Sequence, residues 1–512
     1  MLIRFTLAFF SALIIFFSNV NAQDSLALKY AKTIDANELR SIIFQLAGDE
    51  MEGRASGEEG QKKAAKYISD YYFNCGINPL NETDYYQTFF LKRIRYQSSP
   101  LAIQSNSLIE GVDYAVYNPR TSRKIESSTF LWGVYLNQLD IEKSEVENQI
   151  LIGYDSLLNA LGAEGNTRIA MSNIRKIEEQ LRDKNPKALF VITKNVERFY
   201  KRLKLYYDSN PLFYELNNNE IPIVLISEET ANKIISPSKV KLVKWKKCFD
   251  AGKKTKVIQN FENILLEINS NIEEVSTENV LAYIPGSDLK EELIVITGHY
   301  DHLGKKDGKI YYGADDNGSG TAGIMTLAKA FNNARVNGHG TRRSILIINF
   351  TAEEIGLLGS RYYTSNPVFS LSNTVANLNI DMIGRSDDQH KDNSNYVYVI
   401  GADKLSSQLD SLNTSVNQTY SKMELDYTFN QPNDPNRFYY RSDHYNFAKN
   451  NIPCIFYFSG VHEDYHKPGD TPDKIDINKV EKITKLVFYT AWEIANMPTR
   501  LIVDKAADEN RD

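Results

Sequence analysis

Histidines and carboxylates that could bind metal recur through the second half of this chain, and each follows a short apolar run or precedes a predicted helix. In chain order these residues are His299, Asp301, Asp316, Glu353, Glu354, Asp381 and His466. Imidazole nitrogens and carboxylate oxygens are the ligands that zinc takes in hydrolases, and two neighbouring ions can act together on one reaction. Because α/β enzymes place their chemistry at the carboxyl ends of strands, these residues predict one shared two-metal site.

The adjacent residues Glu353 and Glu354 can divide two roles between them. Neighbouring side chains on one backbone point in different directions, so one carboxylate can bind metal while the other holds a water. Taken alone, such a pair is usually solvated, and His299 or His466 alone is an ordinary strand-end or surface histidine. Their joint occurrence after successive apolar runs favours a catalytic metal site.

Apolar runs that alternate with helical patterns predict the elements that must position these residues. Strands are expected over 293–297, 345–350, 375–380, 396–400 and 453–458, and helices over 319–334 and 480–497. Two further helical patterns lie within residues 26–90. Strands that alternate with helices favour an α/β fold with a mixed, mostly parallel sheet sandwiched by helices.

The segment 95–265 differs in character and predicts an inserted, smaller α/β domain. Three apolar runs in it predict short buried strands, over 150–152, 188–192 and 221–226. It contains no cluster of histidines and carboxylates, so we expect no chemistry in it. The catalytic domain is therefore predicted to be discontinuous, over 23–94 and 266–500, and residues 501–512 form a charged tail.

The first 22 residues have the pattern of a signal peptide. Arg4 gives a positive start, residues 7–17 are almost entirely apolar, and small residues at 20–22 offer a cleavage site. Because the apolar run is short for a membrane span, we expect an exported protein, periplasmic, secreted or at the cell surface, without stable membrane insertion. A retained membrane anchor is the alternative.

Composition limits the partners and the redox chemistry. The 512 residues carry a formal net charge of -6 and no basic block, which argues against a nucleic-acid partner. Three cysteines, Cys75, Cys248 and Cys454, are too few for a disulfide framework. Cys454 lies in an apolar run, which predicts a buried free thiol.

Taken together, the metal-binding motifs resemble those of the M28 family of zinc aminopeptidases and glutamate carboxypeptidases. The resemblance covers residues 26–90 and 275–500, and the insert is similar to a protease-associated domain in its strand pattern. It rests on Gly298-His299-Tyr300-Asp301-His302, Gly313-Ala314-Asp315-Asp316-Asn317, Ala352-Glu353-Glu354, Asn379-Ile380-Asp381 and Tyr465-His466. No departure from the family pattern is found at the ligand and base positions.

The resemblance implies a ligand set for two zinc ions. His299, Asp316 and Asp381 would hold one ion. Asp316, Glu354 and His466 would hold the other, so that Asp316 bridges the two. Such a pair makes water nucleophilic near neutral pH and stabilises the charge that develops on a peptide carbonyl.

The resemblance also implies two supporting roles, with Glu353 as general base and Asp301 as the acid that orients His299. Three residues further along are candidates for substrate binding: Asp443, His444 and His462. The competing interpretation is that Ser442 or Asp443 is simply the N-cap of a helix that begins near residue 444.

The leading hypothesis is an exported di-zinc exopeptidase that acts on peptides and releases N-terminal amino acids. Arg437 and Arg441 keep a carboxypeptidase-like alternative open, since an arginine can bind a terminal carboxylate. A glutaminyl cyclase-like acyl transferase, which needs one zinc, and a binding protein without activity are further alternatives. Oligomeric state, side-chain preference and the choice among zinc, cobalt and manganese stay open.

Overall fold

The computed structural model describes residues 23–80, 83–136, 142–163, 166–215, 220–236, 241–250 and 258–506. The predicted signal peptide, 1–22, and the end of the predicted tail, 507–512, lie outside these described residues.

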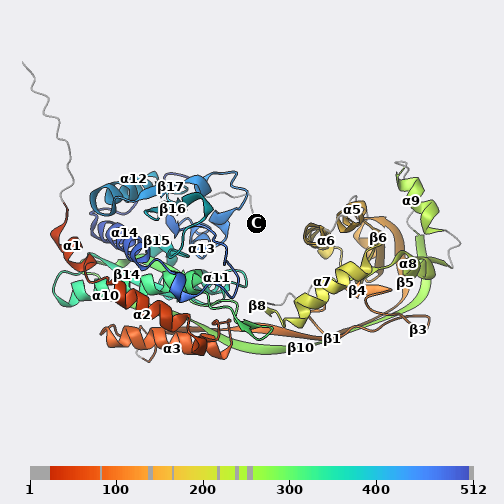
Figure 1. Cartoon of the computed structure of the whole chain (residues 1–512). Coiled ribbons are helices and arrows are strands. Elements are labelled where there is room, and N and C mark those ends of the chain that lie inside the picture. Colours follow the sequence, from red (N-terminus) through yellow and green to blue (C-terminus); the bar gives the residue numbers. More distant parts are fainter. Residues whose placement is uncertain are drawn as a thin grey trace, which may run out of the picture. The chain divides into compact units, whose positions relative to one another are not determined.

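The chain divides into two units (Figure 1). Unit 1 comprises Met1–Phe89 and Thr277–Asp512, and unit 2 comprises Phe90–Ser276. The sequence predicts the insert over 95–265, whereas unit 2 extends beyond this segment at both ends. The reason is that two long strands, β1 (Tyr86–Ser98) and β10 (Ile258–Ile284), continue from one unit into the other.

Unit 1 contains a mixed sheet that confirms the predicted fold class. In spatial order its strands are β17 (Glu424–Asp426), β16 (Tyr396–Ile400), β18 (Cys454–Phe458), β15 (Thr374–Ile380), β11 (Leu289–His299), β14 (Arg343–Phe350) and the last part of β10. The four strands β14, β11, β15 and β18 run parallel, while β10 and β16 pair antiparallel with β14 and β18. The parallel strands therefore end at one common edge.

Helices cover both faces of this sheet. One core contains Ile294 and Ile296 of β11 and residues of six helices: α1 (Ser25–Ala31), α2 (Ala36–Leu46), α3 (Glu59–Asn74), α10 (Gly320–Val336), α12 (Ser407–Val416) and α14 (Ile477–Asn496). A second core contains Leu293 and Val295 with residues of α11 (Leu358–Ser365) and α13 (His444–Ala448). Because alternate residues of β11 enter different cores, both faces of this strand are buried, as expected for a parallel sheet.

Local capping explains where one predicted helix begins. The apolar pattern predicts a helix over 480–497, and α14 starts at Ile477. The carboxylate of Asp476 accepts a hydrogen bond from the Lys479 backbone N–H at 3.1 Å, which satisfies an N–H that the helix itself leaves unpaired. A short hairpin of β12 (Lys305–Lys306) and β13 (Lys309–Ile310) completes the strands of unit 1.

Unit 2 has a sheet of its own. In spatial order its main strands are β5 (Arg123–Tyr135), β6 (Ile150–Tyr154), β7 (Ala188–Ile192), β9 (Ile223–Ile226) and β4 (Tyr114–Val116). All adjacent pairs are parallel except β9 and β4. The three strands expected in the insert are thus present as β6, β7 and β9. The likeness to a protease-associated domain stays a prediction.

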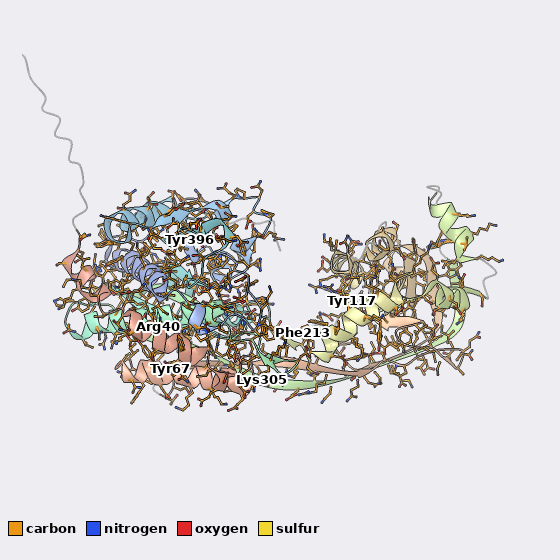
Figure 2. All side chains as sticks on the ribbon, viewed as in Figure 1. Arg40, Tyr67, Tyr117, Phe213, Lys305 and Tyr396 are labelled. Atoms are coloured by element: carbon orange, nitrogen blue, oxygen red, sulfur yellow. The ribbon has the colours of Figure 1, made fainter. Side chains whose placement is uncertain are left out.

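Helices pack on both faces of the unit 2 sheet as well. One core includes residues of α4 (Lys143–Val146), α5 (Ser156–Ala163), α6 (Thr167–Arg182) and α7 (Val196–Asp208). The other includes residues of α8 (Glu228–Ile235) and α9 (Leu242–Asp250). The remaining short strands are β2 (Leu101–Ile103), β3 (Asn106–Ser107) and β8 (Leu212–Phe213). Figure 2 draws the packed side chains, among them Tyr117 in unit 2 and Tyr396 in unit 1.

Two smaller expectations can be compared with the fold. Cys454 in β18 is a buried free thiol, as predicted, and burial raises its pKa to about 12. In the part of the chain that the structure describes, no helix has the length and apolar character needed to cross a membrane.

Candidate metal centre

The carboxyl edge of the parallel strands carries the predicted metal ligands. His299 is the last residue of β11, Asp381 follows β15, and Glu354 lies in the loop after β14. His466 lies in the loop after β18, and Asp316 lies in the turn Ala314–Ser319 that precedes α10. The shared edge of the sheet brings side chains together that are up to 167 positions apart (299 to 466) in the sequence.

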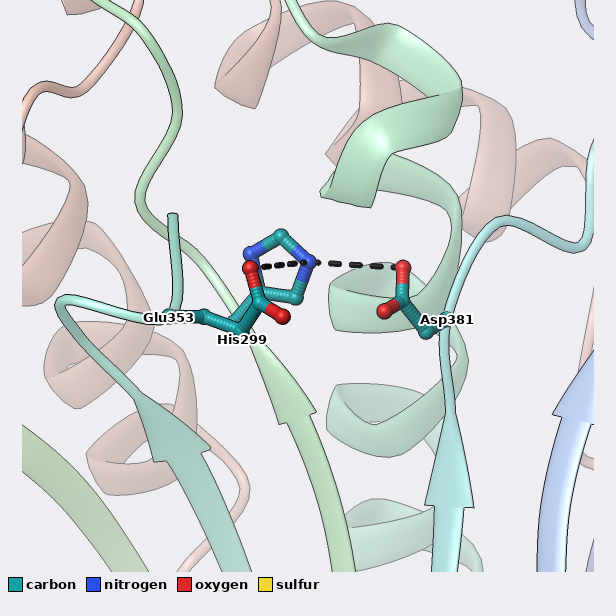
Figure 3. Close-up of side chains that lie close together, drawn as sticks. All are labelled: His299, Glu353 and Asp381. Atoms are coloured by element: carbon teal, nitrogen blue, oxygen red, sulfur yellow. Dashed lines mark hydrogen bonds and ion pairs between the residues drawn. The ribbon is translucent and has the colours of Figure 1, made fainter. Parts of the chain in front are cut away.

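The first ligand set gathers around His299. Its Nε2 lies 3.3 Å from Asp381 Oδ1 and 3.4 Å from Asp316 Oδ1. Glu353 Oε2 is slightly farther from the same nitrogen, at 3.9 Å. Figure 3 shows the His299 ring with Glu353 and Asp381 on either side of it. We call His299 and Asp381 the buried half of the centre.

The second ligand set gathers around His466. Its Nε2 lies 3.2 Å from Asp316 Oδ2 and 3.2 Å from Glu354 Oε2. We call His466 and Glu354 the loop half of the centre. The two carboxylate oxygens of Asp316 therefore face two different histidines, which is the arrangement that a bridging ligand requires.

These separations fit the donor geometry of zinc. Tetrahedral ligands at about 2.0–2.1 Å from a zinc ion lie roughly 3.3 Å from one another. Each of the four distances from His299 and His466 to the aspartates and Glu354 is between 3.2 and 3.4 Å. The residues present thus match a pair of zinc ions in both donor type and spacing.

The electrostatics of the cluster also favour bound cations. Burial raises the pKa of Glu353 well above its ordinary value, and the charges of Glu354 and Asp381 add to this although His299 opposes it. Burial also acts to raise the pKa of Asp316, but hydrogen bonds from His299 and His466 outweigh it and hold that pKa well below the ordinary range. Buried carboxylates at this density are stable when they are paired or coordinate metal.

The turn that carries Asp316 is held from two sides. The peptide bond between Asp316 and Asn317 is cis. The Asn317 side chain donates to the Ile380 carbonyl at 2.9 Å and accepts from the Met382 backbone N–H at 3.1 Å, which ties the turn to the end of β15. Asp470 accepts the backbone N–H of Asp316 at 3.1 Å. Both contacts fix the candidate bridging carboxylate before any metal binds.

Asp301 lies where an orienting acid is expected. Its Oδ1 is 3.7 Å from His299 Nδ1, while the backbone oxygen of Asp301 is nearer to that nitrogen, at 3.2 Å. The Asp301 carboxylate accepts hydrogen bonds from Ser56 Oγ at 2.8 Å and from the Glu353 backbone N–H at 3.1 Å. It therefore connects the first histidine with the residue predicted as base.

Two residues that support ligands were not assigned this role from the sequence. His302 Nδ1 lies 2.6 Å from Glu354 Oε1, so that histidine holds the carboxylate whose other oxygen faces His466. Ser442 donates to Asp381 Oδ2 at 2.8 Å. His302 belongs to the same motif as His299, which is a signal for proximity, whereas Ser442 carries no such signal. Among the described residues, two groups have potential ligand atoms that all lie within 4.8 Å of one another: His299, Glu353 and Asp381, and His302, Asp316 and Glu354.

The three candidates for substrate binding, Asp443, His444 and His462, lie outside the two ligand sets. Asp443 is fully buried, and burial raises its pKa to about 7. It occupies the N-cap position of α13, as the competing interpretation expects, but its side chain makes no capping hydrogen bond there. His444 is buried with its ring stacked on Phe456, at 4.9 Å between ring centroids. His462 Nε2 faces Asp315 Oδ2 at 3.4 Å.

A pocket opens beside the metal ligands. Its polar lining is Asp316, Glu353, Glu354, Asp381, Arg441 and His466. Its apolar and aromatic lining is Met382, Phe438, Phe456, Phe458, Val461 and Tyr465. Asp443, His444 and His462 are not among the described residues that line it. The pocket thus combines several carboxylates, one arginine and an apolar wall.

A parallel α/β sheet with histidines and carboxylates converging at its carboxyl edge is an arrangement typical of metal-dependent hydrolases. Comparison with known proteins shows what this part of the chain is similar to. Residues 279–491 match the model of Peptidase family M28.

Curated proteins similar to this chain are named leucine aminopeptidases. The chain is 29% identical over 271 residues to leucine aminopeptidase 2 of Arthroderma otae, which covers 46% of this chain and 49% of that protein. It is 31% identical over 224 residues to a probable leucine aminopeptidase of the same organism, covering 42% and 57%. The chain thus spans about half the length of these relatives.

The solved aminopeptidase from Aneurinibacillus sp. strain AM-1 has the same fold. The two structures superpose with a TM-score of 0.51 and 17% sequence identity, over 94% of this chain and 98% of that one. At this identity the likeness supports the fold.

Proposed function

We propose that this chain is an exported metallo-exopeptidase that uses two zinc ions to release N-terminal amino acids from peptides. The observation that carries the proposal is the position of Asp316, whose Oδ1 faces His299 and whose Oδ2 faces His466. A carboxylate that serves two ligand sets is what a two-metal hydrolase needs at its centre. The family and the aminopeptidase relatives support the same activity.

The ligand roles follow from the two sets of contacts. His299 and Asp381 would hold one zinc ion and His466 and Glu354 the other, with Asp316 shared between them. When bound, the ions supply Lewis acidity that makes water nucleophilic near neutral pH and stabilises charge on the carbonyl oxygen.

Glu353 takes the role of general base in this proposal. Its carboxylate accepts a proton from the attacking water and passes it to the nitrogen of the departing amine. Burial and the neighbouring carboxylates raise its pKa, which brings a glutamate closer to the neutral range in which a base also serves as an acid. The Asp301 carboxylate accepts a hydrogen bond from the Glu353 backbone N–H at 3.1 Å, which holds the backbone of the proposed base in position.

The aminopeptidase relatives support an amino terminus as the group recognised. Three of the four carboxylates that line the pocket are the candidate zinc ligands, so two bound ions would offset the negative charge of the lining. The wall of Met382, Phe438 and Phe456 suits an apolar side chain on the terminal residue. Arg441 is the observation that favours the second candidate, a carboxypeptidase that binds the opposite terminus.

Matched peptides with free and blocked N-termini test this function. We expect the purified chain to cleave only the free form, to lose activity with a chelator and to regain it with zinc. Removal of residues from the carboxyl end of the blocked peptide would assign carboxypeptidase activity instead. Cyclisation of an N-terminal glutamine by a protein that holds one zinc ion would indicate the cyclase alternative.

Export is supported by the sequence pattern of residues 1–22, with Arg4 before an apolar run and small residues at 20–22. Fractionation of cells that express the full chain tests it. We expect the protein outside the cytoplasm and shortened after residue 22, as measured by the mass of its N-terminal peptide. A full-length protein in the cytoplasm would contradict this proposal.

A further inference from the structure

One buried arginine from the N-terminal segment contacts both ends of the connection between two candidate metal ligands, His299 and Asp316. Arg54 is fully buried, and it lies outside residues 279–491 that match the family model. All of its side-chain hydrogen bonds go to backbone carbonyls: Tyr300 at 2.7 Å, Leu46 at 2.5 Å, Tyr312 at 2.8 Å and Gly313 at 2.8 Å. A guanidinium with no carboxylate bonded to it is unusual, because buried charges are normally paired.

Three of the four carbonyls that Arg54 binds lie at the two ends of the connection from β11 to the Asp316 turn. Tyr300 directly follows the ligand His299, and Gly313 precedes the turn that carries Asp316. One guanidinium therefore holds the start and the end of this connection at fixed positions relative to each other. Its planar fork of donors can serve several carbonyls at once, which an ammonium group cannot do with the same geometry.

The backbone next to Arg54 adds further contacts to the same connection. The His302 N–H donates to the Arg54 carbonyl at 3.2 Å, and the Gly304 N–H donates to the Gly53 carbonyl at 2.9 Å. Gly53 has a φ of +70°, and a Cβ at this position would lie 2.4 Å from the Tyr311 carbonyl oxygen. The close approach between the N-terminal segment and this connection therefore requires glycine here.

Ser56, two residues after Arg54, contacts Asp301, the acid next to His299. Its Oγ donates to Asp301 Oδ2 at 2.8 Å. Burial lowers the pKa of Arg54 to about 10, and Asp470, Asp301 and Asp316 oppose this change, so the guanidinium stays charged at neutral pH. Residues 53–56 thus contact the supports of His299, His302 and Asp316 together.

We propose that Arg54 is a positioning residue for the metal centre: it sets the spacing between His299 and the Asp316 turn and so determines zinc affinity. The inference deepens the proposed function, on which it rests. It assigns to the N-terminal segment, outside the part matched to the family, a direct part in building the site. Arg54 is not among the described residues that line the pocket, and it acts through the backbone carbonyls that it binds.

The test compares Arg54 with a second buried arginine. Arg343, at the start of β14, donates to the carbonyls of Ile494 at 3.0 Å and Met497 at 2.7 Å and lies at the opposite end of the strand from Glu353. We would measure zinc affinity, Tm and kcat/KM for Arg54→Met, Arg54→Lys and the matched Arg343→Met. Zinc affinity is measured by competition with a chelator in the absence of peptide.

We expect Arg54→Met and Arg343→Met to lower Tm to a similar extent, while only the Arg54 variant loses about 10- to 100-fold in zinc affinity, as supporting residues of metal sites do. Arg54→Lys should lose at least about tenfold, since its charge remains but the fork is lost. Guanidinium ion should restore part of the zinc affinity of Arg54→Met.

Two results would overturn the inference. The first is wild-type zinc affinity in Arg54→Lys or Arg54→Met. The second is an equal loss of zinc affinity in Arg343→Met, which would indicate a general effect of lower stability. If Arg54→Met does not fold, Arg54→Lys and Ser56→Ala decide by the same criterion. Zinc affinity needs no substrate, so a wild-type chain that binds zinc but cleaves no peptide refutes the proposed activity separately.

Discussion

The buried half and the loop half of the candidate metal centre use similar residues in very different settings. The His299 side chain is 1% exposed and ends β11, in the middle of the sheet. The His466 side chain is 39% exposed and lies in a loop, with a backbone φ of +56°. A strand fixes its side chain through the sheet, whereas a loop residue depends on local contacts.

The buried half also has more hydrogen-bonded support than the loop half. In the buried half, Asp381 accepts from Ser442 at 2.8 Å, and the His299 carbonyl accepts from Thr321 Oγ1 at 2.6 Å. In the loop half, Glu354 is held by His302, but the structure gives His466 only the carboxylates of Asp316 and Glu354 as ion-pair partners. Pre-organisation therefore predicts that the buried half binds zinc more tightly and fills first.

The largest predicted effect distinguishes loss of catalysis from loss of zinc binding in either half. Glu353→Gln should lower kcat by about 10³-fold, within the range that general acid–base catalysis contributes, and keep full zinc content. The adjacent Glu354→Gln is the matched control and should weaken zinc binding in the loop half. Unchanged kcat in Glu353→Gln would show that another group is the base.

Removal of each histidine tests the comparison directly. His299→Ala should weaken binding of the first zinc ion by more than about 100-fold, beyond the usual effect of losing a supporting residue. His466→Ala should leave that first ion in place and weaken only the second. Titration of metal-free protein with zinc measures both affinities. Equal losses of the first ion in the two variants would contradict a difference between the halves.

Zinc binding in the loop half should depend on pH. Burial works against a proton on His466, but hydrogen bonds to Asp316 and Glu354 raise its pKa to about 10 in the metal-free protein. Zinc must displace that proton, so affinity for the second ion should rise by roughly tenfold per pH unit between about pH 6 and 8. Titrations in buffers of different ionisation enthalpy count the released protons. His466→Ala should release one fewer, and an unchanged count would rule out this origin.

The smallest predicted effect concerns a support of the buried half. Ser442→Ala removes the hydrogen bond to Asp381 Oδ2 and should weaken the first zinc ion by about tenfold. Ser407→Ala, on the exposed start of α12, is a control that should leave affinity unchanged. If the two serine variants bind the first ion equally well, Ser442 does not support the ligand.

The fold and the ligands of the candidate site were accessible from the sequence for a local reason. Each of the strands β11, β14, β15 and β18 is a short apolar run, and parallel strands must end at one edge. Residues that follow such runs, like His299 and Asp381, are therefore brought together by topology alone. Bounds shifted where a cap such as Asp476 lengthened a helix, and short elements such as α11, α12 and β17 had not been expected.

The residues that hold the ligands in place could not be predicted from the sequence in this way. Arg54 reaches Tyr312 across 258 positions, and Ser442 reaches Asp381 across 61, with no periodic pattern to mark either contact. Asp443 occupies the expected N-cap position but is buried there without a capping bond. Contacts of this kind depend on how separate loops meet, which a single sequence does not encode locally.

Zinc titration of the chelator-treated chain tests the central claim most directly. We predict two zinc ions per chain, bound in sequence, with the second ion lost selectively in His466→Ala and peptidase activity appearing as the sites fill. A single ion per chain, held equally well by the wild type and His466→Ala, would contradict the two-metal centre bridged by Asp316.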